Sequence, residues 1–546
     1  MKRLVKGALL AAASLIMATG GASAKSVKVD VGVSQAESFD HLWSKCVGAG
    51  RANEALRAGW LEHMQLAQES CGFEYVRFHG LFHDDMFPVF VENGVYRYNW
   101  QYIDDVFDRL LELNVRPFVE LGFFPEALAG EDSHTVFWWK AKTTPDESKF
   151  GEWHNFIKAF TQHCVDRYGI DEVLTWYFEV WNEPNLSRAF FDGTRSQYFE
   201  LYKQSVTAVR SVDNRLKVGG PSTSNFVADG RYDGESEDNS KFADISADNI
   251  NKLSWKGVWI EEFLAYCKAE KLPVDFISCH PYPTDFPLDP STGRGKDISR
   301  HVTSTKEDIE WLNRALANSA YPDAEIHLTE WSTSPNSRDE MHDKIAPAAY
   351  IVKTNLDCIG LTTSLAYWTF TDVFEEKGGG ASIFHGGFGM INYQGIVKPS
   401  FHAYRMLNQL GDEKLYSDEK LFVSRHSGSG KVVAVAYNYP EEYVNSVPRG
   451  SNDITGGESR DLDLKLTGLK AGAMFKIEVL DWQSGNILDY WRAMGSPEPP
   501  TREQVAVMKQ YANNLRTTTV VADKRGVCEI SHEITPWSIV LIEQID

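Results

Sequence analysis

The sequence is poor in positive charge and has few cysteines. Its 546 residues include 55 lysines and arginines against 76 aspartates and glutamates, which gives a net charge of −21. Nucleic acids and anionic membranes are bound through basic surfaces, so this balance argues against both as partners. The seven cysteines are scattered, odd in number and without a CxxC pair. We therefore expect neither a disulfide framework nor a zinc site.

Long apolar runs are also missing, apart from one short run near the first residue. Lys2, Arg3 and Lys6 precede an apolar run of 11 residues over Ala8–Ala18, which is too short to span a bilayer comfortably. The small residues Ala22–Ala24 then resemble a cleavage site. We expect residues 1–24 to be a signal peptide that is removed on export to the periplasm or beyond. An uncleaved anchor is the alternative.

The rest of the composition is that of a globular protein. Hydrophobic residues make up 43% and charged residues 24%, so disorder is excluded. The length allows about two to four domains. The 16 tryptophans, 22 tyrosines and 30 phenylalanines suit a large core, and they also suit platforms that stack on sugar rings.

Strand-like and helix-like segments alternate from about residue 40 to residue 411. The predicted strands are 75–79, 116–122, 176–181, 216–220, 275–280, 325–330 and 365–370, and the predicted helices are 99–114, 152–168, 196–212, 259–271, 305–318, 346–357 and 400–410. A first strand near Phe39–Cys46 and a helix over Glu54–Gln68 complete eight pairs. This is the count of a (β/α)8 TIM barrel, which we predict for residues 25–411. The alternative, a doubly wound open sheet, is disfavoured because no GxGxxG or Walker loop follows any strand.

Residues 412–546 have a different pattern. Short β-like segments are punctuated by turn residues, with one helix expected near 501–515. We predict an all-β, sandwich-like accessory domain. Ser427–Lys431 is glycine-rich but does not match a phosphate loop, so we interpret it as a hairpin turn. Residues 25–36 are also β-like, and pairing with this domain is one option for them.

Polar residues close most of the predicted barrel strands. They are His79, Asn182, Glu183, His280, Tyr282, Glu330, Trp368, Asp372, Glu375 and Glu376. In a barrel such residues meet at one rim. Two carboxylates there fit glycoside hydrolysis, in which one protonates the leaving oxygen and the other attacks the anomeric carbon or activates water. Glu183 lies beside Trp181 and Pro184, and an apolar setting of this kind raises the pKa of an acid.

The histidines after the second strand do not indicate a metal site. His79, His83, Asp84 and Asp85 have a spacing that suits a metal only on a helix, and this segment leaves a strand. Sugar binding or capping is the preferred interpretation. We expect neither a metal ion nor a cofactor anywhere in the chain.

Several longer stretches are together specific enough to indicate a protein family, although any one of them could occur by chance. They are His41–Arg51, Val76–Gly80, Phe118–Phe123, Phe178–Leu186, Trp259–Leu264, Tyr367–Glu376 and Phe384–Phe388. Through them nearly the whole mature chain resembles glycoside hydrolase family 39, the β-xylosidase and α-L-iduronidase family, and among its members the bacterial β-xylosidases. The resemblance implies a retaining enzyme with Glu183 as acid/base and Glu330 as nucleophile. It also implies that His79, Asn182, His280, Tyr282, Trp368, Glu375 and Glu376 line the −1 subsite.

Two features depart from the family pattern. Family β-xylosidases resemble Thr-Glu-Phe-Asn-Thr-Ser-Tyr after the seventh strand, whereas residues 329–335 here read Thr-Glu-Trp-Ser-Thr-Ser-Pro, so the tyrosine is absent. The second departure is the long acidic loop 225–257, which is expected over the rim or as a solvated insertion.

The leading interpretation is an exo-acting β-D-xylosidase that releases xylose from the non-reducing ends of xylo-oligosaccharides, as in xylan degradation. The predicted rim is mostly acidic and aromatic, which favours a neutral pentose over a uronic acid. The alternatives are α-L-iduronidase, α-L-arabinosidase, β-glucosidase or β-galactosidase activity, and a catalytically silent carbohydrate-binding protein. The oligomeric state is left open, with a homo-oligomer among the options.

Overall fold

The structure is a computed structural model that describes most of the chain after residue 25. The described residues are 26–33, 36–187, 189–224, 226, 230–232, 234–238, 258–285 and 298–546. The expected signal peptide lies outside them, and so does most of the loop 225–257.

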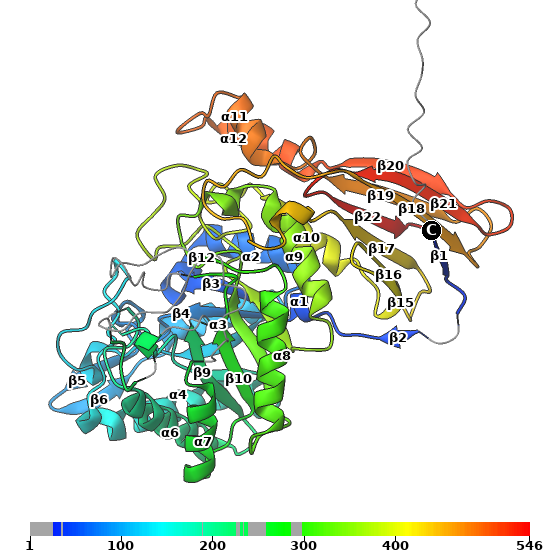
Figure 1. Ribbon diagram of the computed structural model, residues 1–546. Coiled ribbons are helices and arrows are strands. Elements are labelled where there is room, and N and C mark those ends of the chain that lie inside the picture. The colour runs from blue at the N-terminus through cyan, green and yellow to red at the C-terminus, as the bar shows by residue number, and fades with distance from the viewer. Residues whose placement is uncertain are drawn as a thin grey trace, which may run out of the picture.

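Eight parallel strands close into a barrel and follow one another around it in chain order (Figure 1). They are β3 (Cys46–Arg51), β4 (Tyr75–His79), β7 (Arg116–Leu121), β8 (Tyr177–Val180), β9 (Lys217–Ser224), β10 (Phe276–His280), β13 (Glu325–Trp331) and β14 (Ser364–Tyr367). The predicted TIM barrel is therefore confirmed. Two small hairpins lie outside it, β5 (Val89–Glu92) with β6 (Val95–Tyr98) and β11 (Thr284–Asp285) with β12 (Ile298–Ser299).

Amphipathic helices surround the barrel. They are α2 (Ala58–Cys71), α3 (Gln101–Glu112), α4 (Phe150–Tyr168), α6 (Arg195–Val212), α7 (Ile260–Glu270), α8 (Ser304–Ala317), α9 (Ala346–Asp357) and α10 (Pro399–Asn408), with the short α1 (Leu42–Lys45) and α5 (Ile170–Val173) between elements. In α3 the residues Ile103, Val106, Phe107 and Leu110 form one buried stripe. Each such side chain contributes about 1.5–3 kcal/mol on burial, which holds the helix against the sheet.

The first barrel strand is not where the sequence pattern indicated. Phe39–Cys46 was the expected strand, but β3 begins at Cys46 and α1 precedes it. Its sequence, CVGAGR, contains two glycines, which weaken any strand signal. Gly48 has a packing reason, because a Cβ there would lie 2.5 Å from the Trp368 ring. The first helix also starts later, at Ala58, because a 3-10 turn occupies the residues before it.

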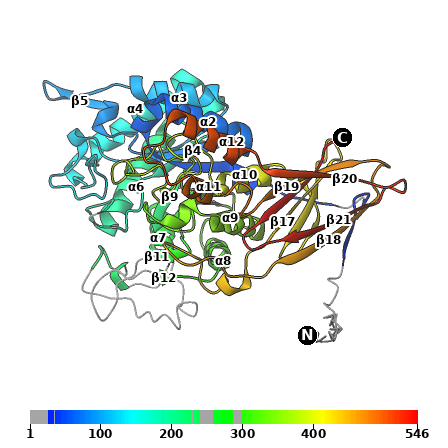
Figure 2. The same cartoon turned by 90° about the horizontal axis from the view of Figure 1, so that it is seen from above.

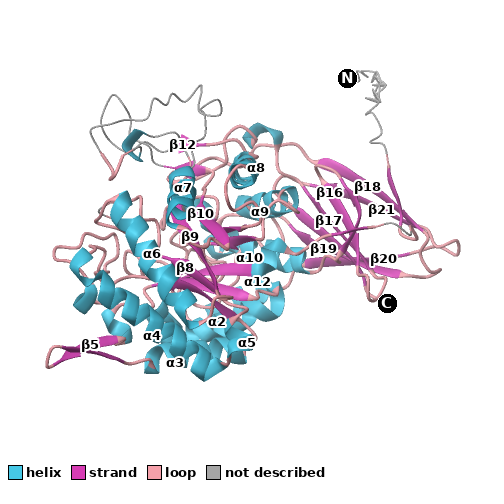
Figure 3. Ribbon diagram, turned by 90° about the horizontal axis from the view of Figure 1, so that it is seen from below, coloured by secondary structure: helices cyan, strands magenta, loops and turns pink. Residues whose placement is uncertain are grey.

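The β-rich part of the chain consists of two sheets stacked face to face (Figure 3). The larger has the order β2 (Glu37–Ser38), β15 (Glu413–Ser417), β16 (Leu421–Arg425), β17 (Val432–Tyr437), β22 (Ile539–Gln544), β19 (Met474–Leu480) and β20 (Arg516–Val521). The smaller has the order β1 (Val27–Asp30), β18 (Arg460–Thr467) and β21 (Cys528–Ile534). A shared apolar core that includes Val423, Leu464 and Ile530 lies between them. The glycine-rich segment Ser427–Lys431 is the hairpin turn between β16 and β17, as predicted.

Both ends of the described chain contribute to these sheets. β1 pairs in parallel with β18, and β2 pairs antiparallel with β15. The opposite face of the larger sheet carries Phe422, Val433 and Val435, which belong to the apolar core of the barrel. The sandwich is thus packed against the barrel.

A helical insertion separates two neighbouring strands of the larger sheet. Between β19 and β20 the chain forms α11 (Ile487–Ala493) and α12 (Arg502–Asn513), which lie over the barrel (Figure 2). The helix expected near 501–515 is therefore present. The shorter α11 was not expected, because two turns carry too little periodic pattern to recognise.

The cysteines form no disulfide. All seven cysteines are buried and free.

Within the part of the chain that the structure describes, every helix is too short or too polar to cross a membrane.

Replacing Gly48 tests the packing of the first strand. We expect Gly48→Ala to lower the free energy of unfolding by about 1–3 kcal/mol, because the new methyl group must displace the Trp368 ring. The matched control is Gly59→Ala in α2, where a Cβ meets nothing within 4 Å. This control should be neutral or stabilising by up to about 1 kcal/mol. Urea denaturation measures both, and equal stabilities would contradict the assignment.

Candidate active site

A cavity of about 520 Å³ opens at the carboxyl ends of the barrel strands. Six of the residues expected at the site line it: His79, Glu183, Tyr282, Glu330, Trp368 and Glu376. Loops supply further lining residues that the sequence pattern did not single out, among them Phe137, Arg231, Asp285, Lys377 and Phe388. The volume is typical of a small-molecule site.

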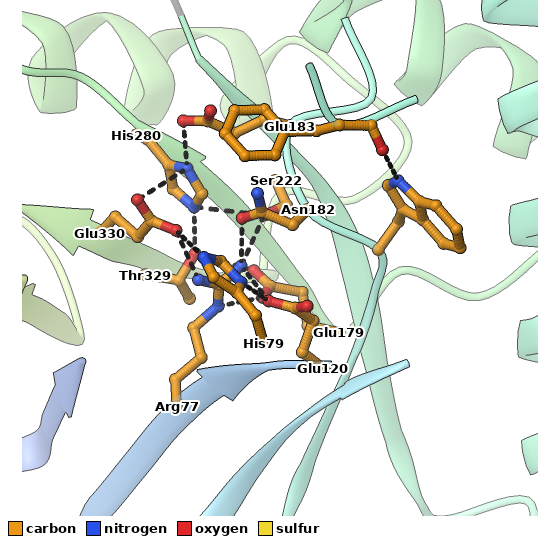
Figure 4. A network of polar contacts seen from close by, with 12 residues as sticks. Arg77, His79, Glu120, Glu179, Asn182, Glu183, Ser222, His280, Thr329 and Glu330 are labelled. Carbon is orange, nitrogen blue, oxygen red and sulfur yellow. Dashed lines mark hydrogen bonds and ion pairs between the residues drawn. The ribbon is translucent and has the colours of Figure 1, made fainter. Parts of the chain in front are cut away.

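Two buried carboxyl groups face each other across this cavity (Figure 4). Glu183 follows β8 and Glu330 lies in β13, and each is only 5% exposed. One carboxyl oxygen of Glu183 and one of Glu330 lie within 4.8 Å of each other. A ring nitrogen of His280 lies within the same distance of both. The pair is close enough for both groups to act on one bound atom.

Burial sets the acidity of Glu183. Removal of its carboxyl from water raises the pKa to about 7, although a hydrogen bond with Ser224 and the charges of His79 and Arg77 act in the opposite direction. The backbone at Glu183 is also unusual, with φ of 45°, and its N–H donates to the Ser222 carbonyl at 2.9 Å. Left-handed backbone at a non-glycine residue is strained, and such strain is often retained at functional positions.

The hydrogen bonds of His280 indicate that the proton of Glu183 is in place. The Thr329 hydroxyl donates to Glu179 at 2.8 Å, so it accepts from Nε2–H of His280 at 3.0 Å. Nδ1 of the same ring then has no proton, because burial lowers the pKa of His280 to about 4 and keeps the ring neutral. The 2.8 Å contact between Nδ1 and Glu183 Oε1 is therefore best satisfied by a protonated Glu183 that donates to the ring.

A fully buried guanidinium lies beneath the site. Arg77 donates to Glu179 Oε2 at 2.5 Å, to Glu330 Oε1 at 2.8 Å and to Asn182 Oδ1 at 2.9 Å. Its NH2 also lies 2.9 Å from Glu120 Oε2. One cation thus holds three buried carboxylates and fixes the orientation of Glu330.

The remaining contacts of Glu330 come from the rim. The Tyr282 hydroxyl donates to Glu330 Oε2 at 3.2 Å, and His79 Nε2 lies 3.5 Å from Oε1. His79 contacts Glu120 through Nδ1 at 2.7 Å, and the charge of Glu120 raises the pKa of His79 despite the opposing effect of burial. The Trp368 ring lies 4.8 Å from the His79 ring and closes this side of the cavity.

Three of the expected residues do not line the cavity. Both carboxylate oxygens of Glu375 are bound by guanidinium groups, Oε2 by Arg51 at 3.1 Å and Oε1 by Arg57 at 2.5 Å. Asn182 and His280 lie one layer deeper, in contact with Arg77 and Glu183 respectively.

Sequence reasoning missed the buried ionic layer. Arg77, Glu120 and Glu179 lie within barrel strands and are at most 1% exposed. The sequence does contain an indication of this layer, because a charged residue inside an otherwise apolar strand needs a buried partner of opposite charge. Which partners they find depends on how the strands align across the barrel.

Comparisons with known proteins agree on one family. The model of glycosyl hydrolases family 39 matches residues 26–231 and 254–529. A β-xylosidase from Geobacillus stearothermophilus is 34% identical over 526 residues, 93% of each chain, and one from Caldicellulosiruptor saccharolyticus is 36% identical over 508 residues, 92% of this chain and 95% of that one. The solved structure of a monomeric β-xylosidase from Caulobacter crescentus CB15 superimposes with a TM-score of 0.79 at 31% identity, covering 95% of this chain and 99% of the other.

Removing the buried guanidinium tests how much it contributes to the stability of the fold. We expect Arg77→Met to lower the free energy of unfolding by about 3–5 kcal/mol, because three carboxylates lose their buried partner. Arg109→Ala is the control, since its pair with Asp105 on α3 is 41% exposed on both sides and is worth about 0.3–0.5 kcal/mol. Chemical denaturation measures both. A loss below 1 kcal/mol for Arg77→Met would show that the layer is not held by this cation.

Proposed function

The chain belongs to glycosyl hydrolases family 39, and from this premise we propose that it is a retaining β-D-xylosidase acting on the non-reducing ends of xylo-oligosaccharides. The observation that carries the mechanism is the approach of Glu183 and Glu330 within 4.8 Å. Retaining enzymes hold their two carboxyl groups about 5–5.5 Å apart, whereas inverting enzymes need about 6.5–9.5 Å to admit a water molecule.

In the first step Glu183 acts as the general acid. Its proton passes to the glycosidic oxygen while the bond from that oxygen to the anomeric carbon breaks. A carboxyl with a pKa near 7 is protonated in about half of the molecules at neutral pH and releases its proton readily, which suits this role.

Glu330 is the nucleophile in the same step. One of its carboxylate oxygens forms a bond to the anomeric carbon, which gives a covalent glycosyl-enzyme. Arg77 and Tyr282 orient the attacking group through its two oxygens. In the second step Glu183, now deprotonated, takes a proton from water, and the water oxygen displaces Glu330 from the sugar.

The proposed glycone is xylose. Two β-xylosidases that are 34% and 36% identical align with more than 90% of this chain, which supports a pentose. Glu376 lines the active-site cavity, and burial raises its pKa to about 7, so it can donate as well as accept. Trp368 provides an aromatic wall.

A second candidate function is α-L-iduronidase activity. The sequence pattern showed no cation at the rim, but Arg231 and Lys377 both line the cavity. Cations are what a uronic acid carboxylate requires. A panel of nitrophenyl and methylumbelliferyl glycosides separates the two: the proposed function requires the β-xyloside to be the best substrate, and a preference for the α-L-iduronide would replace it.

The stereochemistry of the product tests the mechanism. We expect proton NMR of nitrophenyl β-D-xyloside hydrolysis to show β-xylose first, with the α anomer appearing only through mutarotation. Retention follows from two successive displacements at one carbon. If α-xylose is formed first, the enzyme is inverting and Glu330 is not the nucleophile.

The role of Glu183 is tested by pH and by leaving group. We expect kcat/KM to fall as the pH rises through about 7, because the acid is then deprotonated. Glu183→Gln should lose this limb of the pH profile and about 10²–10⁴-fold of kcat/KM on xylobiose. The loss of kcat/KM should be much smaller on a dinitrophenyl xyloside, whose leaving group needs no proton. The control is Glu126→Gln at a side chain that is 73% exposed. Equal losses on both substrates would remove Glu183 from the role of acid.

We also propose that the enzyme acts outside the cytoplasm. The support is the basic and apolar pattern of residues 1–24. Expression in a bacterial host with mass analysis of the periplasmic fraction should give a chain that begins at Lys25. A chain found only in the cytoplasm with its first residues intact would contradict this.

A further inference from the structure

The helical arm, defined as residues 481–515, connects the sandwich to the barrel. It leaves the larger sheet after β19 and returns at β20. Its fully buried residues Ile487, Met508 and Ala512 belong to the apolar core of the barrel, not to the core between the two sheets. The arm is therefore fixed on the barrel.

One exposed carboxylate on the arm holds a loop of the barrel. Glu498 Oε2 accepts from the Ser382 hydroxyl at 2.7 Å and from the Ile383 backbone N–H at 3.0 Å. Next to it the Trp491 ring lies 5.4 Å from the Phe384 ring. These contacts join the arm to the start of the segment Ser382–Phe388, called here the wall loop.

The wall loop ends inside the active-site cavity. Phe388 lines that cavity and lies 5.4 Å from Phe374, which in turn lies 6.0 Å from Trp368. The three rings form a small buried cluster of their own. The position of the Phe388 ring therefore affects the positions of Phe374 and Trp368, the aromatic wall against which a sugar would lie.

The two ends of the wall loop have different side-chain contacts. At the cavity end, Asp343 accepts from the Gly386 N–H at 2.7 Å, and Lys398 donates to the Gly387 carbonyl at 3.0 Å. Both side chains belong to the barrel and are buried. At the other end Glu498, from the β-rich part of the chain, accepts the two hydrogen bonds described above, and Asn392 of the barrel donates to the Ile383 carbonyl at 3.1 Å.

We propose that Glu498 is a positioning residue for the active site, acting through Ser382 and Ile383 on the wall loop and so on Phe388. The effect is on substrate fit, because Glu183 and Glu330 are held by the barrel itself. The proposal rests on the proposed location of the active site in this cavity and not on the identity of the sugar.

The test compares three variants with the unmodified enzyme. Glu498→Ala removes both hydrogen bonds, whereas Glu498→Gln keeps an oxygen that accepts them. Glu503→Ala removes another exposed carboxylate of the same arm. With the nitrophenyl glycoside that the unmodified enzyme hydrolyses best, we expect Glu498→Ala to raise KM about 2- to 10-fold and to leave kcat nearly unchanged. Glu498→Gln and Glu503→Ala should match the unmodified enzyme.

Hydrogen exchange provides a readout that does not depend on substrate. Peptides covering residues 382–388 should exchange faster in Glu498→Ala, while peptides from β16 and β17 and the melting temperature stay unchanged, because Glu498 is exposed and leaves no cavity. Unchanged exchange in the wall loop, or an unchanged KM, overturns the proposal. If the unmodified protein hydrolyses no glycoside, the proposed function fails and the exchange measurement alone decides about the loop.

Discussion

The active site depends on one buried cation. Arg77 is fully buried and contacts three carboxylates from three other barrel strands, Glu120, Glu179 and Glu330. None of these acids could remain charged in the barrel interior without a partner. The guanidinium is suited to this position because its planar group offers several donors in fixed directions. The ion pair with Arg77 therefore compensates the buried charge of Glu330 and also orients this proposed nucleophile.

The two carboxyl groups of the cavity have different surroundings although they lie close together. Glu330 is in direct contact with a cation and a phenol. Glu183 contacts a neutral imidazole whose other nitrogen is occupied by Thr329. Separate surroundings of this kind allow one carboxyl to attack while the other carries a proton. His280 thus contacts Glu183 directly without lining the cavity.

The sequence predicted the parts of this structure that depend on local pattern. Strand β4 and helix α9 have the bounds that periodicity indicated, and Glu183 and Glu330 could be singled out because each stands at the end of a predicted strand. The parts that depend on packing across the barrel were not predicted. β3 contains Gly48 because the Trp368 ring occupies the space that a side chain would need, and Glu375 binds two arginines that come together only after folding. The ionic partners of Arg77 are distant in sequence for the same reason.

The pairing of β1 with β18 has a consequence for the order of folding. Val27 is aligned with Leu464, and β22, in the middle of the larger sheet, ends at Gln544. All eight barrel strands leave the ribosome before the sandwich strands that follow residue 412. The sandwich therefore cannot close until β22 has been synthesised, and β1 has no partner strand until β18 follows the whole barrel. Contacts this distant in sequence form slowly. The N-terminal strand is thus the element whose exposure lasts longest in a new chain, and the one on which a chaperone would have the most time to act.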